Sequence, residues 1–455
     1  MKKTVKIVAS LVLIVSFLLL VACGGGSQTP SGSSTNTATN TQTSTNTATS
    51  SSGTEGVTIN FMADSRQEFT KMLNLYPEFE KATGIKLNFI QLEETPLRSK
   101  TGLELAAPST DIDVIMMDFT FVAKYSKAGY LQSLDELLAK EPTFKKEDFM
   151  QSFIDGCSYE GKLYAVPINQ DCSIMTYRAD IFAELDLDVP KTFEELEEVC
   201  KKIKAAYPNM AAISMRGARG AGLNEWTWPT FLWGFGGRYY DDNYKAVLNS
   251  PEAVKALEYY ANLLKNYGPQ GVANYSYVEV QNDMAQGLAA IMIDSATLSP
   301  RCEDPSYSKV AGKLSYAKVP GIPGKEQPGF YAWTLAIPKN SKNHEAAAKF
   351  VAWLASPEVA KKVGWSAPNQ ALEAVYSLPV YEGYDQAKSL YDVMLESLAI
   401  ANPDFRPRLE VGTEISTRVS EAISSVLAGE TDAKTALDAC NADVDKILKD
   451  GGYQK

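Results

Sequence analysis

The chain opens with two contrasting patterns of hydrophobic and polar positions. A basic head precedes a predominantly apolar run over residues 7–22. This run is shorter than the roughly 20 apolar residues of a membrane-spanning helix, and with its basic flank it is typical of a signal peptide. Residues 24–55 are almost wholly Gly, Ser, Thr, Asn, Ala and Gln, which bury too little apolar surface to fold. We predict a signal peptide over residues 1–22 and a disordered tether over 23–56.

Cys23 lies where these two patterns meet. The run Leu20-Val21-Ala22-Cys23, followed by three glycines, resembles the lipobox of bacterial lipoproteins. The resemblance implies that Cys23 becomes the first residue, carries diacylglycerol on its sulfur, and holds the protein outside the cytoplasm through acyl chains alone. A secretory signal that happens to contain a cysteine is the alternative. About 32 tether residues give an r.m.s. reach of roughly 30 Å.

The folded sequence begins with alternating strand and helix patterns. Residues 57–62, 85–92 and 113–117 have the composition of strands, and residues 66–81 and 95–107 have helical apolar spacing. This order predicts a mainly parallel sheet covered on both faces. Ligands of such sheets lie beyond the carboxyl ends of the strands. The loops there carry Ser65, Arg66, Gln67, Asp118, Phe119 and Thr120.

A second α/β region follows the extended residues 164–171. Thr192 and Glu195 form a capping-box pattern at the start of a helix that ends near residue 206. Ser250 before a proline predicts another helix, which ends at residue 267. Strands are predicted at 211–215, 289–293 and 331–337, and two helices within 413–449. A folded part of about 400 residues favours two domains over one core.

Composition excludes several classes of function. The formal net charge is −11, and removal of three lysines with the signal peptide leaves about −14, which disfavours nucleic acid as a partner. A single histidine, His344, excludes a multi-histidine zinc site. Cys200 and Cys440 lie on apolar helical stripes typical of a core, and a Cys157–Cys172 disulfide is compatible with an oxidising exterior. No cofactor motif is present, so we expect no cofactor.

Three of the six tryptophans lie in residues 226–237. One interpretation is a buried helix face. The other is a stacking platform, since sugar rings expose C–H patches that pack on aromatic faces. Trp226, Trp233 and Phe235 are the candidates for a pocket wall.

Three aspartates, Asp118, Asp171 and Asp294, each lie at a strand end. Carboxylates accept hydroxyl hydrogen bonds strongly, which suits neutral sugars or polyols. Paired carboxylates also suit glycoside hydrolysis, and aspartates at loop ends are common helix N-caps. These alternatives stay open from the residues alone.

Several short motifs occur in a characteristic order. Residues 111–118 read Asp-Ile-Asp-Val-Ile-Met-Met-Asp, and residues 161–167 read Gly-Lys-Leu-Tyr-Ala-Val-Pro. Met-Thr-Tyr-Arg follows at 175–178, and further segments lie at 235–237, 287–292 and 336–343. In this order they resemble the family 1 extracellular solute-binding proteins of carbohydrate ABC transporters, the maltose-binding-protein-like group. Arg178 stands where that family usually has an asparagine, and its usual late tryptophan is replaced here by Arg406 and Arg408.

The resemblance implies an α/β fold of two lobes with three interlobe crossings and a central ligand cleft. It places lobe one at 57–168 plus 328–367 and lobe two at 169–327 plus 368–455. It implies a monomer that is not an enzyme, binds a carbohydrate and delivers it to ABC permease subunits. Alternatives are the same fold binding iron, polyamine or a vitamin, or a lipid-anchored glycan-degrading enzyme. The implied site residues are Ser65, Arg66, Gln67, Asp118, Asn169, Asp171, Trp233, Asp294, Tyr331, Trp333 and Asn369.

Overall fold

The computed structural model describes residues 56–454, without the side chains of Gln67, Glu94 and Thr95. The predicted signal peptide, the lipidation of Cys23 and the tether lie outside the described residues. Within the described part, no helix is both long and apolar enough to cross a membrane.

The first of two main sheets has the strand order β2-β1-β3-β12-β6. Its predicted strands are present, and β1 pairs in parallel with both β2 and β3. The remaining two strands run antiparallel to their neighbours, so the sheet is mixed rather than wholly parallel. The strands are β1 (Thr58–Asp64), β2 (Lys86–Leu92), β3 (Val114–Asp118), β6 (Ala165–Pro167) and β12 (Trp333–Ala336).

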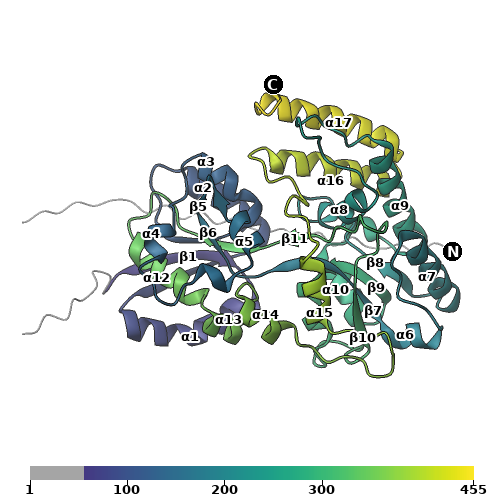
Figure 1. The fold of residues 1–455 in the computed structure, drawn as a ribbon, viewed down its shortest axis with the longest axis horizontal. Coiled ribbons are helices and arrows are strands. Elements are labelled where there is room, and N and C mark those ends of the chain that lie inside the picture. The colour runs from purple at the N-terminus through teal and green to yellow at the C-terminus, as the bar shows by residue number, and fades with distance from the viewer. Residues whose placement is uncertain (1–55, 455) are drawn as a thin grey trace, which may run out of the picture. The chain divides into compact units, whose positions relative to one another are not determined.

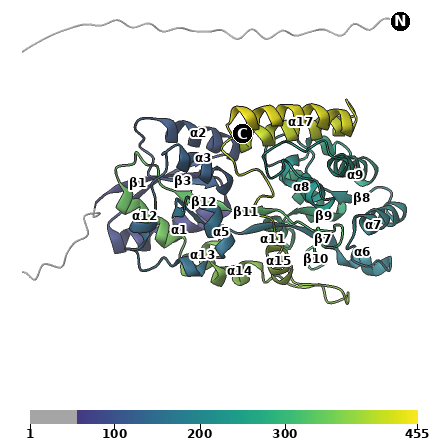
Figure 2. The ribbon, with the colours of Figure 1, turned by 45° about the horizontal axis from the view of Figure 1, so that its top comes forward.

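The second sheet has the order β10-β7-β9-β8, and the short strand β11 also pairs with β7. Only β8 and β9 are parallel. Figures 1 and 2 show the two sheets as the centres of two lobes, each covered by helices. The strands are β7 (Asp171–Arg178), β8 (Ala211–Ser214), β9 (Ala289–Ser295), β10 (Leu314–Lys318) and β11 (Phe330–Tyr331).

The single strand predicted over residues 331–337 is two strands. Strand β11 pairs with β7 of the second sheet, whereas β12 pairs with β3 and β6 of the first. The chain changes sheets at Ala332, between the two, because the two halves find different partners. Strand periodicity carries no information about which sheet supplies the partner.

Helix boundaries agree closely with the sequence patterns. Thr192 caps α7 in a capping box, Ser250 caps α9 with proline at the first position, and Gly429 ends α16 in the left-handed conformation. The helices are α1 (Gln67–Thr83), α2 (Glu94–Ala106), α3 (Val122–Lys127), α4 (Asp135–Leu138), α5 (Gln151–Gly156), α6 (Ala179–Glu184), α7 (Phe193–Ala206), α8 (Asn224–Gly234), α9 (Pro251–Tyr267), α10 (Tyr277–Ala285), α11 (Ser299–Cys302), α12 (His344–Leu354), α13 (Pro357–Val363), α14 (Asn369–Tyr376), α15 (Leu390–Leu398), α16 (Gly412–Ala428) and α17 (Ala433–Asp450).

Three chain segments meet where the two sheets adjoin. The backbone N–H of Ile168 donates to the Trp333 carbonyl at 2.8 Å, and the N–H of Trp333 donates to the Asn169 side chain at 2.7 Å. The N–H of Gln170 donates to the Ser366 hydroxyl at 2.9 Å. These bonds connect the β6–β7, β11–β12 and α13–α14 links, so the three links form one hydrogen-bonded junction.

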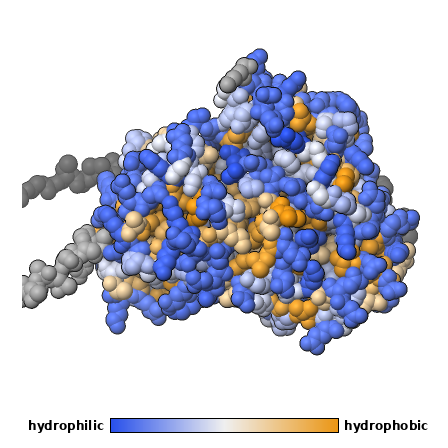
Figure 3. Space-filling model, in the orientation of Figure 1, coloured by the Kyte–Doolittle hydropathy of each residue, from blue (hydrophilic) through white to orange (hydrophobic). Residues whose placement is uncertain are grey.

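The five cysteines in the described part of the chain are free and buried. The disulfide considered between Cys157 and Cys172 is therefore absent, and both thiols lie enclosed in apolar core. Cys200 and Cys440 are core residues, as predicted. The outer face seen in Figure 3 is mainly hydrophilic, with smaller separate apolar areas.

Candidate functional site

Asp118 forms the centre of a buried charged cluster at the carboxyl end of β3. It is 2% exposed, and its Oδ2 accepts from Arg98 of α2 at 2.7 Å and from Arg406 at 3.2 Å. Thr120 donates both its backbone N–H, at 2.9 Å, and its hydroxyl, at 2.7 Å, to Oδ1. Burial alone would raise the pKa of Asp118, but the two guanidinium groups outweigh it and lower the pKa to about 2. Asp118 is therefore a charged acceptor at neutral pH.

Arg406 connects this carboxylate with a second buried one. Its Nη1 lies 3.6 Å from Oε2 of Glu225, which is fully buried in α8. Glu225 also accepts from the hydroxyls of Tyr239, at 3.1 Å, and Ser416, at 2.9 Å. Tyr239 is 2% exposed. The Tyr239 hydroxyl is buried beside Glu225 because a buried glutamate requires hydrogen-bond donors.

Aromatic rings surround the cationic side of the cluster. The guanidinium carbons of Arg66 and Arg98 lie 4.8 and 4.9 Å from the ring centroid of Trp333. Tyr331 packs edge-on against Trp333 at 5.6 Å and against Trp226 at 5.7 Å. Cation–π contacts hold guanidinium groups in place while excluding water. The result is a charged cluster packed among aromatic rings.

The second sheet contributes an ion pair at the end of β9. Arg216, which follows β8, donates three hydrogen bonds of 2.6 to 3.0 Å to Asp294. Both side chains are buried, and the guanidinium carbon of Arg216 lies 5.8 Å from the ring centroid of Trp226. A buried carboxylate engaged this closely is held in one orientation. Trp226 therefore contacts both the Arg216 ion pair and, through Tyr331, the Asp118 cluster.

Asp171 begins β7 next to this ion pair. Its Oδ2 accepts from the hydroxyls of Ser295 and, at 3.4 Å, Thr297, whereas its buried Oδ1 has no hydrogen-bond partner. Burial raises the pKa of Asp171 to about 6, and nearby Asp294 adds to the effect. Leaving a buried acceptor without a donor costs free energy, so a ligand hydroxyl that donates to Oδ1 would be bound favourably.

Ionisation of Asp171 should make the folded chain less stable as the pH rises from about 4 to about 6. In this window the folded state keeps a proton that the unfolded state has lost. A pKa of about 6 in place of 3.8 corresponds to about 3 kcal/mol of unfolding free energy. Urea unfolding at several pH values should show this slope, and Asp171→Asn should flatten it. An unchanged slope in the variant would rule Asp171 out as the titrating group.

Other buried polar atoms near Asp171 and Trp226 also lack partners. They are Oγ of Ser173, Nε1 of Trp226 and Nε of Arg406. A β-carbon added at Gly329 would lie 2.5 Å from Oγ of Ser173 and 2.9 Å from Cη2 of Trp226, so the Ser173 hydroxyl and the outer edge of the Trp226 ring both lie close to the Gly329 backbone. Together with Oδ1 of Asp171 they offer both donors and acceptors, which is what a polyhydroxylated solute requires.

The predicted site residues fall into three groups. Arg66, Asp118, Asp171, Asp294, Tyr331 and Trp333 belong to the cluster just described. Asn169 supports it from the junction, and Trp233 adjoins it by donating Nε1 to the Phe405 carbonyl at 3.1 Å. Ser65 and Asn369 are exposed at its margins, and the Ser65 hydroxyl donates to Glu93. The side chain of Gln67 lies outside the described residues.

The structure adds four charged residues to these predictions: Arg98, Arg216, Glu225 and Arg406. Arg216 follows a strand, just as Asp118 ends one. The expectation that ligands lie beyond the carboxyl ends of strands could therefore have identified Arg216 too. Arg98 and Glu225 lie within helices, where no periodicity distinguishes them. Arg406 stands in a segment between α15 and α16. The sequence placed it where the family usually has a tryptophan, and the structure shows its contacts with Asp118 and Glu225.

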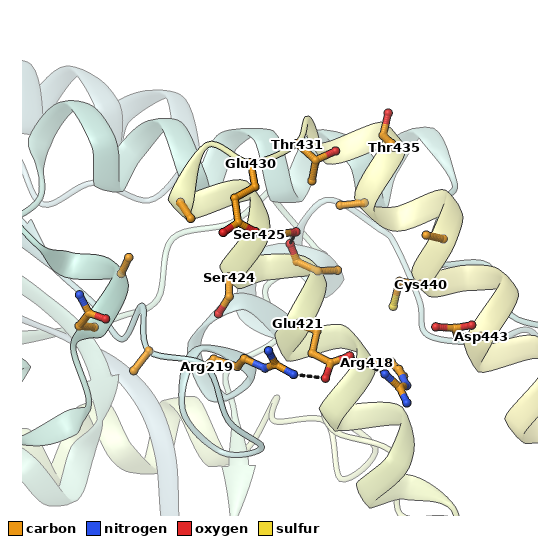
Figure 4. Close-up of a pocket in the computed structure, with 17 residues that line it drawn as sticks. Arg219, Arg418, Glu421, Ser424, Ser425, Glu430, Thr431, Thr435, Cys440 and Asp443 are labelled. Atoms are coloured by element: carbon orange, nitrogen blue, oxygen red, sulfur yellow. Dashed lines mark hydrogen bonds and ion pairs between the residues drawn. The ribbon is translucent and has the colours of Figure 1, made fainter.

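A cavity of 970 Å³ away from the cluster is bordered by α16, α17 and the 218–219 and 273–274 loops, and none of the predicted site residues lines it. Figure 4 shows Arg219 directed at Glu421 there, an ion pair that satisfies both charges. A second cavity of 570 Å³ is lined by Thr120, Trp233 and Arg408 among others, and so adjoins the cluster. Residues 56–454 contain no group of three or more His, Cys, Asp or Glu arranged to hold a metal ion.

Comparison with known sequences supports a common origin along most of the chain. Residues 63–361 match the sequence profile described as bacterial extracellular solute-binding protein. A mannitol-binding protein of Pseudomonas aeruginosa is 28% identical over 426 residues, covering 89% of this chain and 96% of the relative. An erythritol/L-threitol-binding protein of Mycolicibacterium smegmatis is 22% identical and covers 85% of this chain and 80% of the relative.

Solved structures agree with the fold. An ABC transporter solute-binding protein from Agrobacterium vitis, with bound D-mannitol, has a TM-score of 0.77 and 28% identity. The alignment covers 88% of this chain and all of that one. A ribitol complex from Agrobacterium radiobacter has a TM-score of 0.76 at 25% identity, covering 87% of this chain and 99% of that one. Together with the two sheets described above, these similarities confirm the expected two-lobe solute-binding fold.

Proposed function

The chain belongs to the bacterial extracellular solute-binding protein family, and on that premise we propose that it captures a sugar or polyol for an ABC importer. The observation that carries the proposal is the buried cluster around Asp118. Its carboxylates and guanidinium groups can bond several hydroxyls, and its aromatic walls exclude water. Relatives whose names or bound ligands include mannitol, ribitol and erythritol support the same solute class.

We propose lobe one at residues 57–168 plus 328–367 and lobe two at 169–327 plus 368–455. The hydrogen-bonded junction at residues 168–171, 330–333 and 366–369 would then act as the hinge. A solute that contacts Asp118 on one lobe and Asp171 or Asp294 on the other favours the closed state by its differential contacts. The closed form would dock on permease subunits and release the solute to them.

Membrane attachment follows from the sequence pattern at Cys23. Acyl chains on Cys23 and the polar tether over 24–55 would keep a monomeric binding protein within roughly 30 Å of the membrane. That distance allows the lobes to open, close and turn beside the permease.

Binding rather than catalysis is the role that the carboxylates favour. Both oxygens of Asp118 accept hydrogen bonds, and its pKa of about 2 keeps it deprotonated at neutral pH. Asp294 is likewise engaged by Arg216. Asp118 is therefore not poised to donate the proton that glycoside hydrolysis requires of one carboxyl group. Asp171, whose pKa is raised to about 6, is the carboxyl group of the site that could donate one, and the assay for released reducing ends tests it.

Titration calorimetry on protein freed of ligand by unfolding and refolding tests the proposal. We expect saturable binding of at least one ligand among mannitol, ribitol, erythritol, glucose and maltose. Asp118→Ala should abolish it, whereas the matched variant Asp242→Ala, at a surface position, should not. Binding of spermidine or ferric citrate without any sugar or polyol would contradict the proposal. So would release of reducing ends from a polysaccharide.

A further inference from the structure

A glycine-rich loop, residues 217–223, leads from Arg216 into α8 and lies beside both charged groups of the site. The carbonyl of Gly222 accepts from Nη1 of Arg216 at 2.7 Å. Gly222 has a φ of +80°, which glycine adopts without strain, and a β-carbon added there would lie 3.3 Å from Nη1 of Arg406. The backbone of the loop therefore lies next to the guanidinium groups that bind Asp294 and Asp118.

Buried hydrogen bonds connect this loop with α16. Ser420 of α16 is 0% exposed, and its hydroxyl accepts from the backbone N–H of Gly220 at 2.7 Å and donates to Oδ1 of Asn224 at 2.7 Å. Nδ2 of Asn224 donates in return to the Ser420 carbonyl and to the Ser424 hydroxyl, both at 3.1 Å. The backbone N–H of Asn224 donates to the Ala218 carbonyl at 3.0 Å and so closes the loop. The Ser420 hydroxyl thus holds both the middle and the end of the loop.

A second link between the loop and α16 is the ion pair of Arg219 with Glu421, which Figure 4 shows. The Arg219 side chain is 63% exposed, and exposed ion pairs contribute little to stability. Loss of the Ser420 hydroxyl, in contrast, would leave two buried groups, the Gly220 N–H and Oδ1 of Asn224, without this partner. Ser420 is therefore the stronger of the two links.

We propose that Ser420 is a positioning residue for solute binding, which fixes the 217–223 loop from α16 and, through the Gly222 carbonyl, sets the orientation of Arg216. The guanidinium group of Arg216 donates three hydrogen bonds to Asp294 and one to Gly222. It keeps one orientation as long as both acceptors keep their places. This inference rests on the proposed function, because Arg216 and Asp294 belong to the proposed solute site.

Calorimetry on the ligand-free full-length protein measures the effect on affinity, with mannitol, ribitol, erythritol, glucose and maltose as probes. Ser420→Ala should weaken the probe that binds the parent protein most tightly by about tenfold, roughly the effect of one or two lost buried hydrogen bonds. Alanine favours a helix, and Ser420→Cys, which keeps the size but is a weaker donor and acceptor, should act in the same direction.

Ser425→Ala is the matched control on the same helix. Its hydroxyl donates to the Ala422 carbonyl within α16 at 2.9 Å and not to the loop. This variant should leave the affinity of each probe within about twofold of the parent value.

A measurement without ligand separates positioning from a general loss of stability. The Nε–H signal of Arg216 in ¹H–¹⁵N NMR spectra, assigned by its disappearance in Arg216→Met, reports the hydrogen bonding of that guanidinium group. We expect Ser420→Ala to shift or broaden this signal and Ser425→Ala to leave it in place. A variant that was merely less stable would keep the signal of its folded molecules unchanged.

The two measurements fail in distinguishable ways. An unchanged Arg216 signal or an unchanged affinity in Ser420→Ala would overturn this inference alone. Failure of all five probes to bind the parent protein would overturn the proposed function, and the Arg216 signal would still show whether Ser420 orients that side chain.

Discussion

Asp118→Asn is expected to lower the free energy of unfolding by about 3 kcal/mol or more. The substitution keeps the shape of the side chain but removes the negative charge that Arg98 and Arg406 share, so that Glu225, 3.6 Å from Arg406, has to balance that guanidinium group alone. Removing one partner of a buried ion pair typically costs 3–5 kcal/mol, because the remaining charge stays desolvated. Urea unfolding at pH 7, followed by tryptophan fluorescence, measures the difference.

Asp242→Asn is the matched control. Asp242 pairs with Arg238 at 2.8 Å, nearly the 2.7 Å of the Asp118–Arg98 contact, but its side chain is 86% exposed. An exposed pair contributes at most about 1 kcal/mol, so this variant should unfold almost like the parent protein. Equal losses of unfolding free energy in the two variants would show that burial does not make the Asp118 ion pairs more stabilising than an exposed pair.

The lowered pKa of Asp118 also predicts how the stability of the protein changes at acidic pH. Because the pKa of Asp118 is lowered to about 2, its contribution to stability is complete above about pH 4 and is lost as the pH falls toward 2. Asp118→Asn should therefore remove part of the acid sensitivity of the parent protein. This window lies below the one assigned to Asp171.

Arg216→Met should have an effect of similar size on the other sheet. The variant keeps an apolar stem against Trp226 but deprives Asp294, whose side chain is fully buried, of three hydrogen bonds. The expected loss is about 3–5 kcal/mol of unfolding free energy, by the same argument of an unpaired buried charge. Ligand affinity should also fall, since Asp294 and Trp226 lose their fixed orientation.

Arg219→Met provides the control from the same loop. Arg219 pairs with Glu421, but its side chain is 63% exposed, so the expected loss is below about 1 kcal/mol. Thermal unfolding and calorimetry on both variants measure stability and binding together. A stable Arg216→Met variant with unchanged affinity would contradict the role assigned to the Arg216–Asp294 pair.

Much of the local structure could be predicted because its causes are local. The capping box at Thr192, the Ser250–Pro251 helix start and the glycine at 429 all act within one turn of helix. Strand β3 ends at Asp118 as its apolar pattern ends. The predicted strand at 331–337 was wrong as one element because pairing with two different sheets is a long-range choice.

Only part of the candidate site could be predicted from the sequence in this way. Aspartates at strand ends were found because strand ends are visible in the pattern. Arg98 and Glu225 were missed because a charged residue within a helix is normally solvated, and the sequence carries no mark of the partner that makes burial tolerable.

The sequence by itself determined several strands and helix ends, the net negative charge of the chain, the lipobox-like start and the order of motifs that resembles the binding-protein family. These properties depend on neighbouring residues or on composition. The tertiary structure alone decided that Arg406, 288 positions after Asp118, reaches it at 3.2 Å, and that Trp226 lies against Tyr331. Such contacts arise from the packing of two sheets and their crossings, which no local pattern encodes.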